Sequence, residues 1–404
     1  NALANSPDDY ATNLIAGFFA MNQGELEKAL AMYSKAVKVA VNNEEELMGA
    51  LFAKGQVEAS LKRYSEAEKT YNLLVRDYPE SEWGYKGLLH VTSLQYDADK
   101  AILKLERVAE KSRKTTPYAV LIKSVLVRGD IDAANGYFQK IKAMDSEDKS
   151  IEMLEFTINY ATALKALSLN NFDEARELIA PILVSQPDNL KVLSFLVDLE
   201  LRANKLNEAE KVLSQLENLS PNLPAVSLLK GELALKNKDL EEAKAQFKKS
   251  WASSPSAVAG EKLFRVFGML KQKPAQDKHL EDWIAKFPNN SLAVLFQAVN
   301  KQQKGDQPEA IVGYEKVLKV APNNVMALNN LGWIYFEQGD DAALKLLKRA
   351  ADLAPGSAAV LDSYGWVLAK SGRVDEGLVY LEKANQLSPE NQEIADHLAA
   401  AKKM

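Results

Sequence analysis

Apolar residues recur along the chain at the spacing of one helix face, in segments that are separated by short polar turns. In the stretch "ALNNLGWIYFEQGD", residues 327–340, the apolar positions follow a helical period, and the Gly339–Asp340 pair ends the segment. Related turns follow comparable segments elsewhere, as in "KNKDLEEA", "QKGDQPEA" and "KSGRVDEG". The pattern therefore predicts an all-α chain of helical hairpins, each with a first helix, a tight turn and a second helix.

Seven prolines give this pattern a fixed period. Successive members of the series are 33 or 34 residues apart: Pro187, Pro221, Pro255, Pro288, Pro322, Pro355 and Pro389. A regular spacing of this size is typical of a repeat architecture. Proline cannot continue a helix, so each one is expected just after the second helix of its repeat. Asparagine follows in "PDNLKV", "PNNVMA" and "PENQEI", where its side chain can cap the next first helix.

Small and large apolar residues keep the same phase within the repeats. Four alanines stand 12 residues before the proline of their repeat: Ala209, Ala243, Ala310 and Ala343. Five large apolar residues stand eight residues before it: Leu213, Phe247, Tyr314, Leu347 and Leu381. Alanine at a helix crossing lets two helices approach closely, and the large residue fills the space beside it. A single hairpin cannot bury its own apolar face, so neighbouring hairpins are expected to stack.

The repeat resembles the tetratricopeptide repeat (TPR) pattern. In residues 325–357 the matching positions, with one residue deleted in the turn, are Leu331, Gly332, Tyr335, Gly339, Asp340, Ala343, Ala350 and Pro355. The resemblance covers nearly the whole chain. It implies an all-α TPR solenoid, a right-handed superhelix of about eleven helix-turn-helix repeats with a C-terminal capping helix, whose first helices line a concave groove.

The sequence suggests three segments. These are the N-terminal TPR repeats (1–148), the C-terminal TPR repeats (149–391) and the capping helix (392–404). The first boundary falls in "DSEDKSI", residues 145–151, which adds residues between two repeats and is expected to form a hinge or a long loop. Residues 392–404, "QEIADHLAAAKKM", resemble a lone first helix with the polar face that a solenoid end needs for solubility.

Composition narrows the range of functions. The chain of 404 residues has a net charge of -5, which argues against a nucleic-acid partner because such proteins need a basic face. It contains no cysteine, which excludes disulfides, thiolate metal sites and a cysteine nucleophile. No apolar run approaches the roughly 20 residues of a membrane-spanning helix.

The repeats contain no evident catalytic, cofactor or metal site. His90, His279 and His397 lie in different repeats without the spacing of metal ligands. Turn geometry explains the Gly-Asp pairs, and helix capping explains carboxylate pairs such as Asp340–Asp341. No phosphate-binding loop, dinucleotide fingerprint or hydrolase motif occurs. Because no residues remain for a separate catalytic domain, we interpret the chain as a non-enzyme without cofactor or metal.

The TPR resemblance assigns groove-facing positions to the first helix of each repeat. The candidate partner-binding residues are Asn329, Trp333, Phe336 and Glu337 in one repeat, Asp362, Trp366 and Lys370 in the next, and Phe18 and Phe52 near the N-terminus. The two tryptophans occupy the same position in adjacent repeats. A pair of aromatic residues with polar neighbours suits a peptide or a sugar. The alternative is that these aromatic rings pack between successive first helices as core.

The C-terminal part has a narrower resemblance. The "NNLGW" start, the shortened repeat after it, "AVLDSYGWVLAKSG" and the closing "PENQEIADHLAAA" are similar to the TPR-repeat lipoproteins of bacterial PEP-CTERM/exosortase exopolysaccharide systems. The resemblance implies a non-catalytic protein-protein interaction scaffold in the cell envelope, in the periplasm or attached to the outer membrane. It would serve exopolysaccharide export or surface-protein sorting, and a signal sequence and lipid anchor would lie before Asn1.

Two other functions stay open. A cytosolic TPR adaptor or regulator would bind a peptide of its partner in the same groove, and its location would be cytoplasmic. Direct polysaccharide binding in the groove would depend on Trp333 and Trp366. The expected partners are therefore peptide segments of proteins or other envelope components, with polysaccharide as an alternative.

Overall fold

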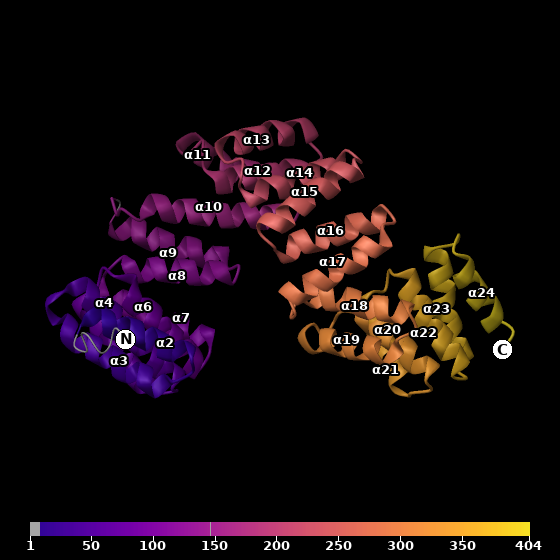
Figure 1. The fold of residues 1–404 in the computed structure, drawn as a ribbon, viewed down its shortest axis with the longest axis horizontal. Coiled ribbons are helices and arrows are strands. Elements are labelled where there is room, and N and C mark those ends of the chain that lie inside the picture. The colour runs from indigo at the N-terminus through magenta and orange to yellow at the C-terminus, as the bar shows by residue number, and fades with distance from the viewer. Residues whose placement is uncertain (1–8, 146) are drawn as a thin grey trace. The chain divides into compact units, whose positions relative to one another are not determined.

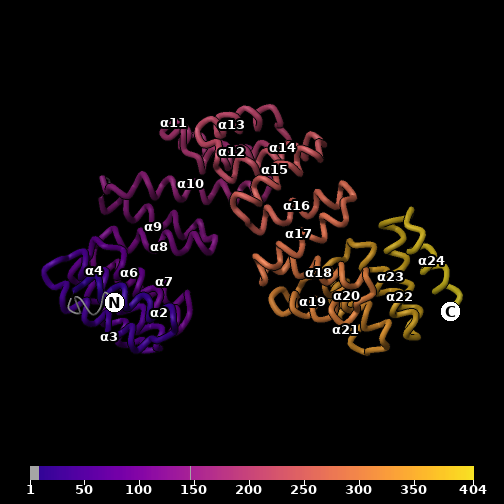
Figure 2. Tube along the Cα trace, viewed as in Figure 1, coloured from indigo at the N-terminus to yellow at the C-terminus, as the bar shows by residue number. Residues whose placement is uncertain are grey.

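The computed structural model describes residues 9–145 and 147–404, and every regular element in these residues is a helix (Figure 1). The α-helices follow one another as eleven pairs, α2–α3 to α22–α23, and the single helix α24 comes last. Figure 2 shows the short turns that join the two helices of a pair. The predicted fold class is confirmed: the described residues form an all-α array of helical hairpins with a C-terminal capping helix.

The contacts within the chain divide it into two compact units, Asn1–Ala203 and Asn204–Met404. The helices of the first unit are α2 (Tyr10–Asn22), α3 (Leu26–Val39), the short 3₁₀ helix η1 (Ala40–Asn42), α4 (Glu44–Ser60), α5 (Tyr64–Asp77), α6 (Glu82–Gln95), α7 (Ala98–Ser112), α8 (Thr116–Val127), α9 (Ile131–Met144), α10 (Ile151–Ser168), α11 (Phe172–Ser185) and α12 (Leu190–Arg202). Within this unit each hairpin packs against the next one along the chain.

The second unit continues the same arrangement. Its helices are α13 (Leu206–Leu219), α14 (Pro224–Lys236), α15 (Leu240–Ser253), α16 (Ala257–Met269), α17 (Lys273–Lys286), α18 (Ser291–Gln303), α19 (Gln307–Val320), α20 (Val325–Glu337), α21 (Ala342–Leu353), α22 (Ala358–Lys370), α23 (Val374–Leu387) and α24 (Gln392–Ala401). No helix in the described part of the chain is both long enough and apolar enough to cross a membrane.

The signals for helix ends act as predicted. Pro355 lies two residues beyond the end of α21, and the other six prolines of the series occupy the same place after their second helices. Asn324 caps α20, because its Oδ1 accepts a hydrogen bond from the Ala327 backbone N–H at 2.9 Å. Asn189 and Asn391 cap α12 and α24 in the same way. These caps satisfy backbone donors that a helix leaves unpaired at its start.

The turns within the hairpins use the left-handed backbone region. Gly339 has φ of 72° and Gly372 has φ of 83°, whereas Lys238 and Asn204 adopt 63° and 58° at the equivalent turns of other hairpins. Glycine takes this conformation without steric cost, so the Gly-Asp pairs are turn residues as predicted.

The core is built from the residues that repeat in phase. Ala209, Ala243 and Ala310 are fully buried where two helices cross, and Phe247 and Tyr314 are fully buried beside them. Side chains from consecutive hairpins pack into shared clusters, one of which spans α14 to α18. Stacking of neighbours therefore provides the core that one hairpin lacks.

The connection between α9 and α10 is shorter than the seven-residue hinge or loop that the sequence predicts at 145–151. The helix α9 ends at Met144 and α10 begins at Ile151, the last residue of that segment. Ser146 lies outside the described residues. The division of the chain by contacts falls after Ala203, and the domain boundary between residues 148 and 149 stays a prediction from sequence.

Candidate partner-binding face

The seven candidate residues of the last two full repeats lie on two neighbouring first helices. Asn329, Trp333, Phe336 and Glu337 belong to α20, whereas Asp362, Trp366 and Lys370 belong to α22. The two helices pack against each other within the second unit. These seven residues are called the Trp333–Trp366 patch below. The equivalent positions in the sequence thus become neighbouring positions on one face.

The indoles of Trp333 and Trp366 are both partly buried. Each ring therefore packs in the core on one side, as the core interpretation expects, and stays accessible on the other, as the groove interpretation expects. Trp333 packs against a cluster of buried residues that includes Leu328 and Leu361. Trp366 packs against a second cluster that includes Ala369 and Leu381. Part of each ring stays accessible. A ring that is anchored on one side and accessible on the other is well suited to contact a partner.

His397 of the capping helix α24 lies against both tryptophans. Its ring stacks on Trp366 with the centroids 4.3 Å apart and the planes inclined by 16°. Its centroid is 6.5 Å from that of Trp333, with the planes inclined by 28°. The helix α24 packs on α22 and α23, which places His397 here. The capping helix therefore places a fourth ring beside those of Trp333, Phe336 and Trp366.

Asp362 holds His397 in this position. Only 6% of Asp362 is exposed, and its Oδ2 lies 2.8 Å from His397 Nδ1. Burial raises the pKa of Asp362, while the hydrogen bond from His397 acts in the opposite direction. A buried carboxylate without a partner would be costly, so the pair explains how the carboxyl group is accommodated. Asp362 therefore orients His397 and is too buried to offer a partner much surface.

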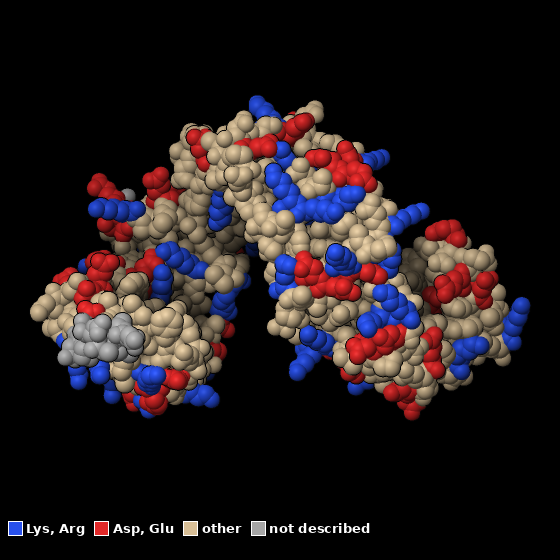
Figure 3. Space-filling view, viewed as in Figure 1, with Lys and Arg blue, Asp and Glu red and all other residues tan. Residues whose placement is uncertain are grey.

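Glu337 and Lys370 are the exposed charged residues of the patch. Glu337 Oε1 accepts a hydrogen bond from Trp333 Nε1 at 3.0 Å, and its Oε2 accepts one from Gln307 at 3.0 Å. Lys370 Nζ lies 4.6 Å from the centroid of the Trp366 ring, a cation-π distance. The patch thus carries both signs of charge, in keeping with the mixed acidic and basic residues on the visible face (Figure 3).

Phe336 and Asn329 complete the patch. The Phe336 ring lies 5.9 Å from that of Trp333, with the planes inclined by 60°. Asn329 Nδ2 contacts Asn330 Oδ1 at 3.4 Å, whereas the buried Asn329 Oδ1 accepts no hydrogen bond from the described residues. Because this oxygen has essentially no accessible surface, it belongs to the internal packing of the helices and is not available to a bound segment.

The two N-terminal candidates lie apart from this patch in the sequence and in their contacts. Phe18 of α2 is 56% exposed and meets Phe19 edge-on at 6.1 Å. Phe52 of α4 is partly buried between Tyr71 and Trp83, at centroid distances of 6.0 and 5.6 Å. No ring contact joins Phe18 to Phe52 within residues 9–145. Whether any of the nine candidates binds a partner stays a prediction.

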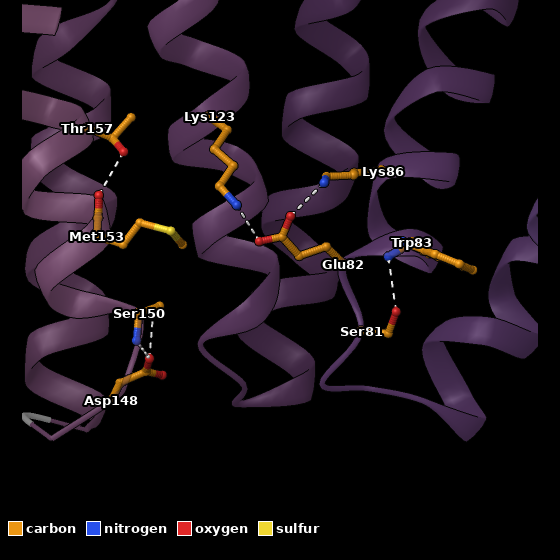
Figure 4. A network of polar contacts seen from close by, with 9 residues as sticks. All are labelled: Ser81, Glu82, Trp83, Lys86, Lys123, Asp148, Ser150, Met153 and Thr157. Carbon is orange, nitrogen blue, oxygen red and sulfur yellow. Dashed lines mark hydrogen bonds and ion pairs between the residues drawn. The ribbon is translucent and has the colours of Figure 1, made fainter. Parts of the chain in front are cut away.

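The first helices of the first unit also carry a charged network that sequence reasoning missed (Figure 4). Glu82 of α6 pairs with Lys86 on the same helix and with Lys123 of α8. Burial would raise the pKa of Glu82, but the ammonium groups of Lys123 and Lys86 outweigh it and lower that pKa. The neighbouring Trp83 is 38% exposed. This face therefore also combines an accessible indole with charges.

The histidines of the described residues lie in different surroundings. No three His, Asp or Glu residues of residues 9–145 and 147–404 are grouped as metal ligands would be. His279 is buried with its Nε2 at 2.8 Å from the Gly260 carbonyl oxygen, whereas His90 is exposed. Partly accessible aromatic rings beside two exposed charges can contact a polypeptide.

The inward position of His397 could have been predicted from the spacing of apolar residues in α24. Ile394, His397, Leu398 and Ala401 fall at i, i+3, i+4 and i+7, which is one face of a helix. In the structure Ile394 and Ala401 are buried on that face. The prediction treated α24 as a polar cap and His397 as a surface or internally satisfied residue, so this inward face was missed.

Comparisons with known proteins bear on the repeats. Family models described as tetratricopeptide repeat match residues 20–82 and 166–233, and one described as TPR repeat matches residues 302–339. Photosystem I assembly protein Ycf3 of Prochlorococcus marinus (strain MIT 9211) is 34% identical over 137 residues, which cover 31% of this chain and 74% of that protein.

Two further similarities extend over more of the chain. TPR repeat-containing protein PA4667 of Pseudomonas aeruginosa is 24% identical over 204 residues, which cover 48% of this chain and 34% of that protein. The chain thus spans about a third of that relative's length. The crystal structure of the APC/C hetero-tetramer Cut9-Hcn1 aligns with a TM-score of 0.49 at 14% identity, covering 97% of this chain and 83% of that one.

Proposed function

The chain belongs to the tetratricopeptide repeat family, and from that premise we propose that it is a non-catalytic scaffold that binds peptide segments of protein partners on its first-helix face. TPR repeats support a protein-protein interaction role in general. The Trp333–Trp366 patch is the proposed binding surface. The family relationship supports the general role, and the geometry of the patch supports the choice of surface.

One observation carries the choice of the patch. Two indoles that stay partly accessible, Trp333 and Trp366, lie beside the exposed charges of Glu337 and Lys370. The backbone of a bound segment offers N–H groups, and its side chains offer apolar surface. A peptide can therefore donate to the exposed Glu337 carboxylate and cover the rings of Trp333 and Phe336 at the same time.

The relative Ycf3 is named as an assembly protein of photosystem I. That word favours an adaptor role for this chain, in which the scaffold holds one protein while a larger complex forms. Sugar stacking is less favoured than peptide binding, because the Trp366 ring already contacts the His397 ring and the Lys370 ammonium group. The proposal therefore takes a protein segment as the ligand and leaves polysaccharide as the alternative.

A pull-down from envelope and cytosolic fractions of the native organism tests this proposal. The baits are this chain, the Trp333→Ala/Trp366→Ala variant and a matched Trp83→Ala control in the first unit, with bound proteins identified by mass spectrometry. We expect specific partners on the unchanged bait and the control, and their loss from the double variant. Partners retained by the double variant would reject the patch as the binding surface.

The setting of this function is a further part of the proposal. The resemblance to envelope lipoproteins suggests the bacterial cell envelope, with a lipid anchor upstream of Asn1 and exopolysaccharide export or surface-protein sorting as the process. It rests on sequence resemblance alone, and the alternative is a cytosolic adaptor. Immunoblots of membrane, periplasmic and cytosolic fractions decide between them, since a purely cytosolic protein would exclude the envelope setting.

A further inference from the structure

A cleft of about 680 Å³ lies in the second unit away from the Trp333–Trp366 patch. Its walls come from the second helices α15 and α17, and its floor includes residues of the first helix α16. The lining residues include Trp251, Leu263, Phe267, Ala275 and His279. We call this the α15–α17 cleft. Its volume falls in the range of roughly 300–1,000 Å³ that small-molecule sites occupy.

The floor of the cleft is aromatic and fixed in place. Trp251 and Phe267 are 8% and 4% exposed, and the His279 ring lies 5.0 Å from the Trp251 ring, edge to face. Trp251 Nε1 donates a hydrogen bond to Asp282 Oδ2 at 2.8 Å. Side chains that are buried and hydrogen-bonded keep one orientation. The floor is therefore preformed, and small accessible parts of its rings face the cleft.

The floor carries no charge of its own near neutral pH. Burial lowers the pKa of His279, and the Gly260 carbonyl oxygen holds its Nε2 at 2.8 Å. A neutral imidazole with this hydrogen bond donates from Nε2. The aromatic floor thus matches an uncharged, flat part of a ligand.

Two lysines that make no ion pair face this cleft from opposite walls. Lys248 belongs to α15 and Lys278 to α17; both are exposed, and neither lies within ion-pair distance of a carboxylate in the described residues. Lys248 Nζ lies 5.5 Å from the centroid of the Phe267 ring. Basic side chains also gather on the visible face over α15 and α16 (Figure 3).

The two acidic residues of the cleft, Asp282 and Glu281, differ in whether an ion pair compensates their charge. Asp282 pairs with Lys286 and accepts from Trp251, so its charge is compensated. Glu281 lines the cleft without such a partner in the described residues and opposes the two lysines. The two positive charges of Lys248 and Lys278 face the single negative charge of Glu281. The cleft therefore has one positive charge that no carboxylate compensates.

We propose that the α15–α17 cleft binds a small organic anion with an aromatic or branched apolar body. The body lies over Ala275 and the accessible parts of the Trp251 and Phe267 rings, and the anionic group lies between the ammonium groups of Lys248 and Lys278. Apolar contact supplies most of the affinity, and the two cations select the sign of the head group. The site is independent of the proposed partner-binding patch.

Titration with 1-naphthoate tests this site, with binding measured by isothermal calorimetry and by the indole N–H resonance of Trp251, assigned with Trp251→Phe. We expect saturable binding that shifts this resonance. The cation 1-naphthylmethylammonium has the same apolar body and is expected to bind at least about fivefold more weakly. Equal binding of the two probes would show apolar adhesion without charge selection and would overturn the proposal.

Variants of the full chain with changed charges test whether the lysines of the cleft select the anion. Lys278→Glu is expected to weaken 1-naphthoate binding about fivefold, and Glu281→Lys is expected to strengthen it. Lys249→Glu changes the charge of an exposed α15 lysine that does not line the cleft, and it should leave binding unchanged. Circular dichroism confirms that each variant is folded. Loss of binding in Trp333→Ala/Trp366→Ala would move the ligand to the patch and overturn the proposal.

Discussion

Tyr71 shows how single residues set the spacing of these helices. Its ring is fully buried, and a Cβ built on Gly55 of α4 would lie 2.6 Å from the ring atoms Cε1 and Cζ. Real contacts of a Cβ are not that short, so the ring or the helix would have to move. The glycine in the first helix is therefore a packing requirement, created by the aromatic residue of the second helix.

Exchange of this glycine gives a direct test at the residue scale. We expect Gly55→Ala to lower the free energy of unfolding by about 1–3 kcal/mol, because it overpacks a rigid site. Gly136→Ala on α9 is the matched control, since nothing lies within 4 Å of a Cβ built there. Alanine at such an open helical position should raise stability by about 0.5–1 kcal/mol. Urea unfolding measures both, and equal effects would contradict the packing account.

Helix α24 is the element whose role differs most from its prediction. It was expected to shield the end of the solenoid, and its buried Ile394 and Ala401 do so. It also carries His397 to Asp362 and Trp366. The element therefore shapes the proposed binding face as well as ending the stack.

Removal of the His397 ring tests this role. In His397→Ala the buried Asp362 loses its partner, and we expect a loss of about 2–4 kcal/mol in the free energy of unfolding at neutral pH. Burial raises the pKa of Asp362 in the folded chain, so its neutral form is favoured there at acid pH. Stability from such a group is present at low pH and is lost as pH rises through the folded pKa.

The deficit of His397→Ala should therefore shrink as pH falls, which urea unfolding at neutral and acid pH measures. The double variant Asp362→Ala/His397→Ala removes the carboxyl group and should recover part of the loss. A deficit that is the same at every pH, with no recovery in the double variant, would mean that the pair contributes only packing.

Elements were predictable where the cause is local. The prolines after second helices, the Asn324 cap and the positive φ of Gly339 follow from the chemistry of a few neighbouring residues. The stack of His397 on Trp366 was not predicted, because it joins residues of two repeats through a helix whose inward face was read as polar. The start of α10 at Ile151 was also missed, although Ser150 stands at its N-cap and Asp148 Oδ1 accepts a hydrogen bond from the Ser150 backbone N–H.

At the scale of the whole molecule, the chain consists of two units, and within each unit a hairpin mainly contacts its neighbours. Neighbouring first helices of a unit share one face, and different parts of such a face can serve different ligands. The central claim assigns protein partners to one part, the Trp333–Trp366 patch. The positions of Trp333 and Trp366 on adjacent helices were predictable from the repeat, whereas their partial burial depends on the packing around them.

Site-specific photo-crosslinking in the native organism tests that claim most directly. A benzophenone amino acid replaces Lys370, which lies at the patch, or Lys345, an exposed residue of the second helix α21 in the preceding hairpin. We expect covalent adducts with one or a few proteins from position 370, their loss in the Trp333→Ala background, and no such adducts from position 345. Equal adducts from both positions, or adducts from position 345 alone, would contradict the account.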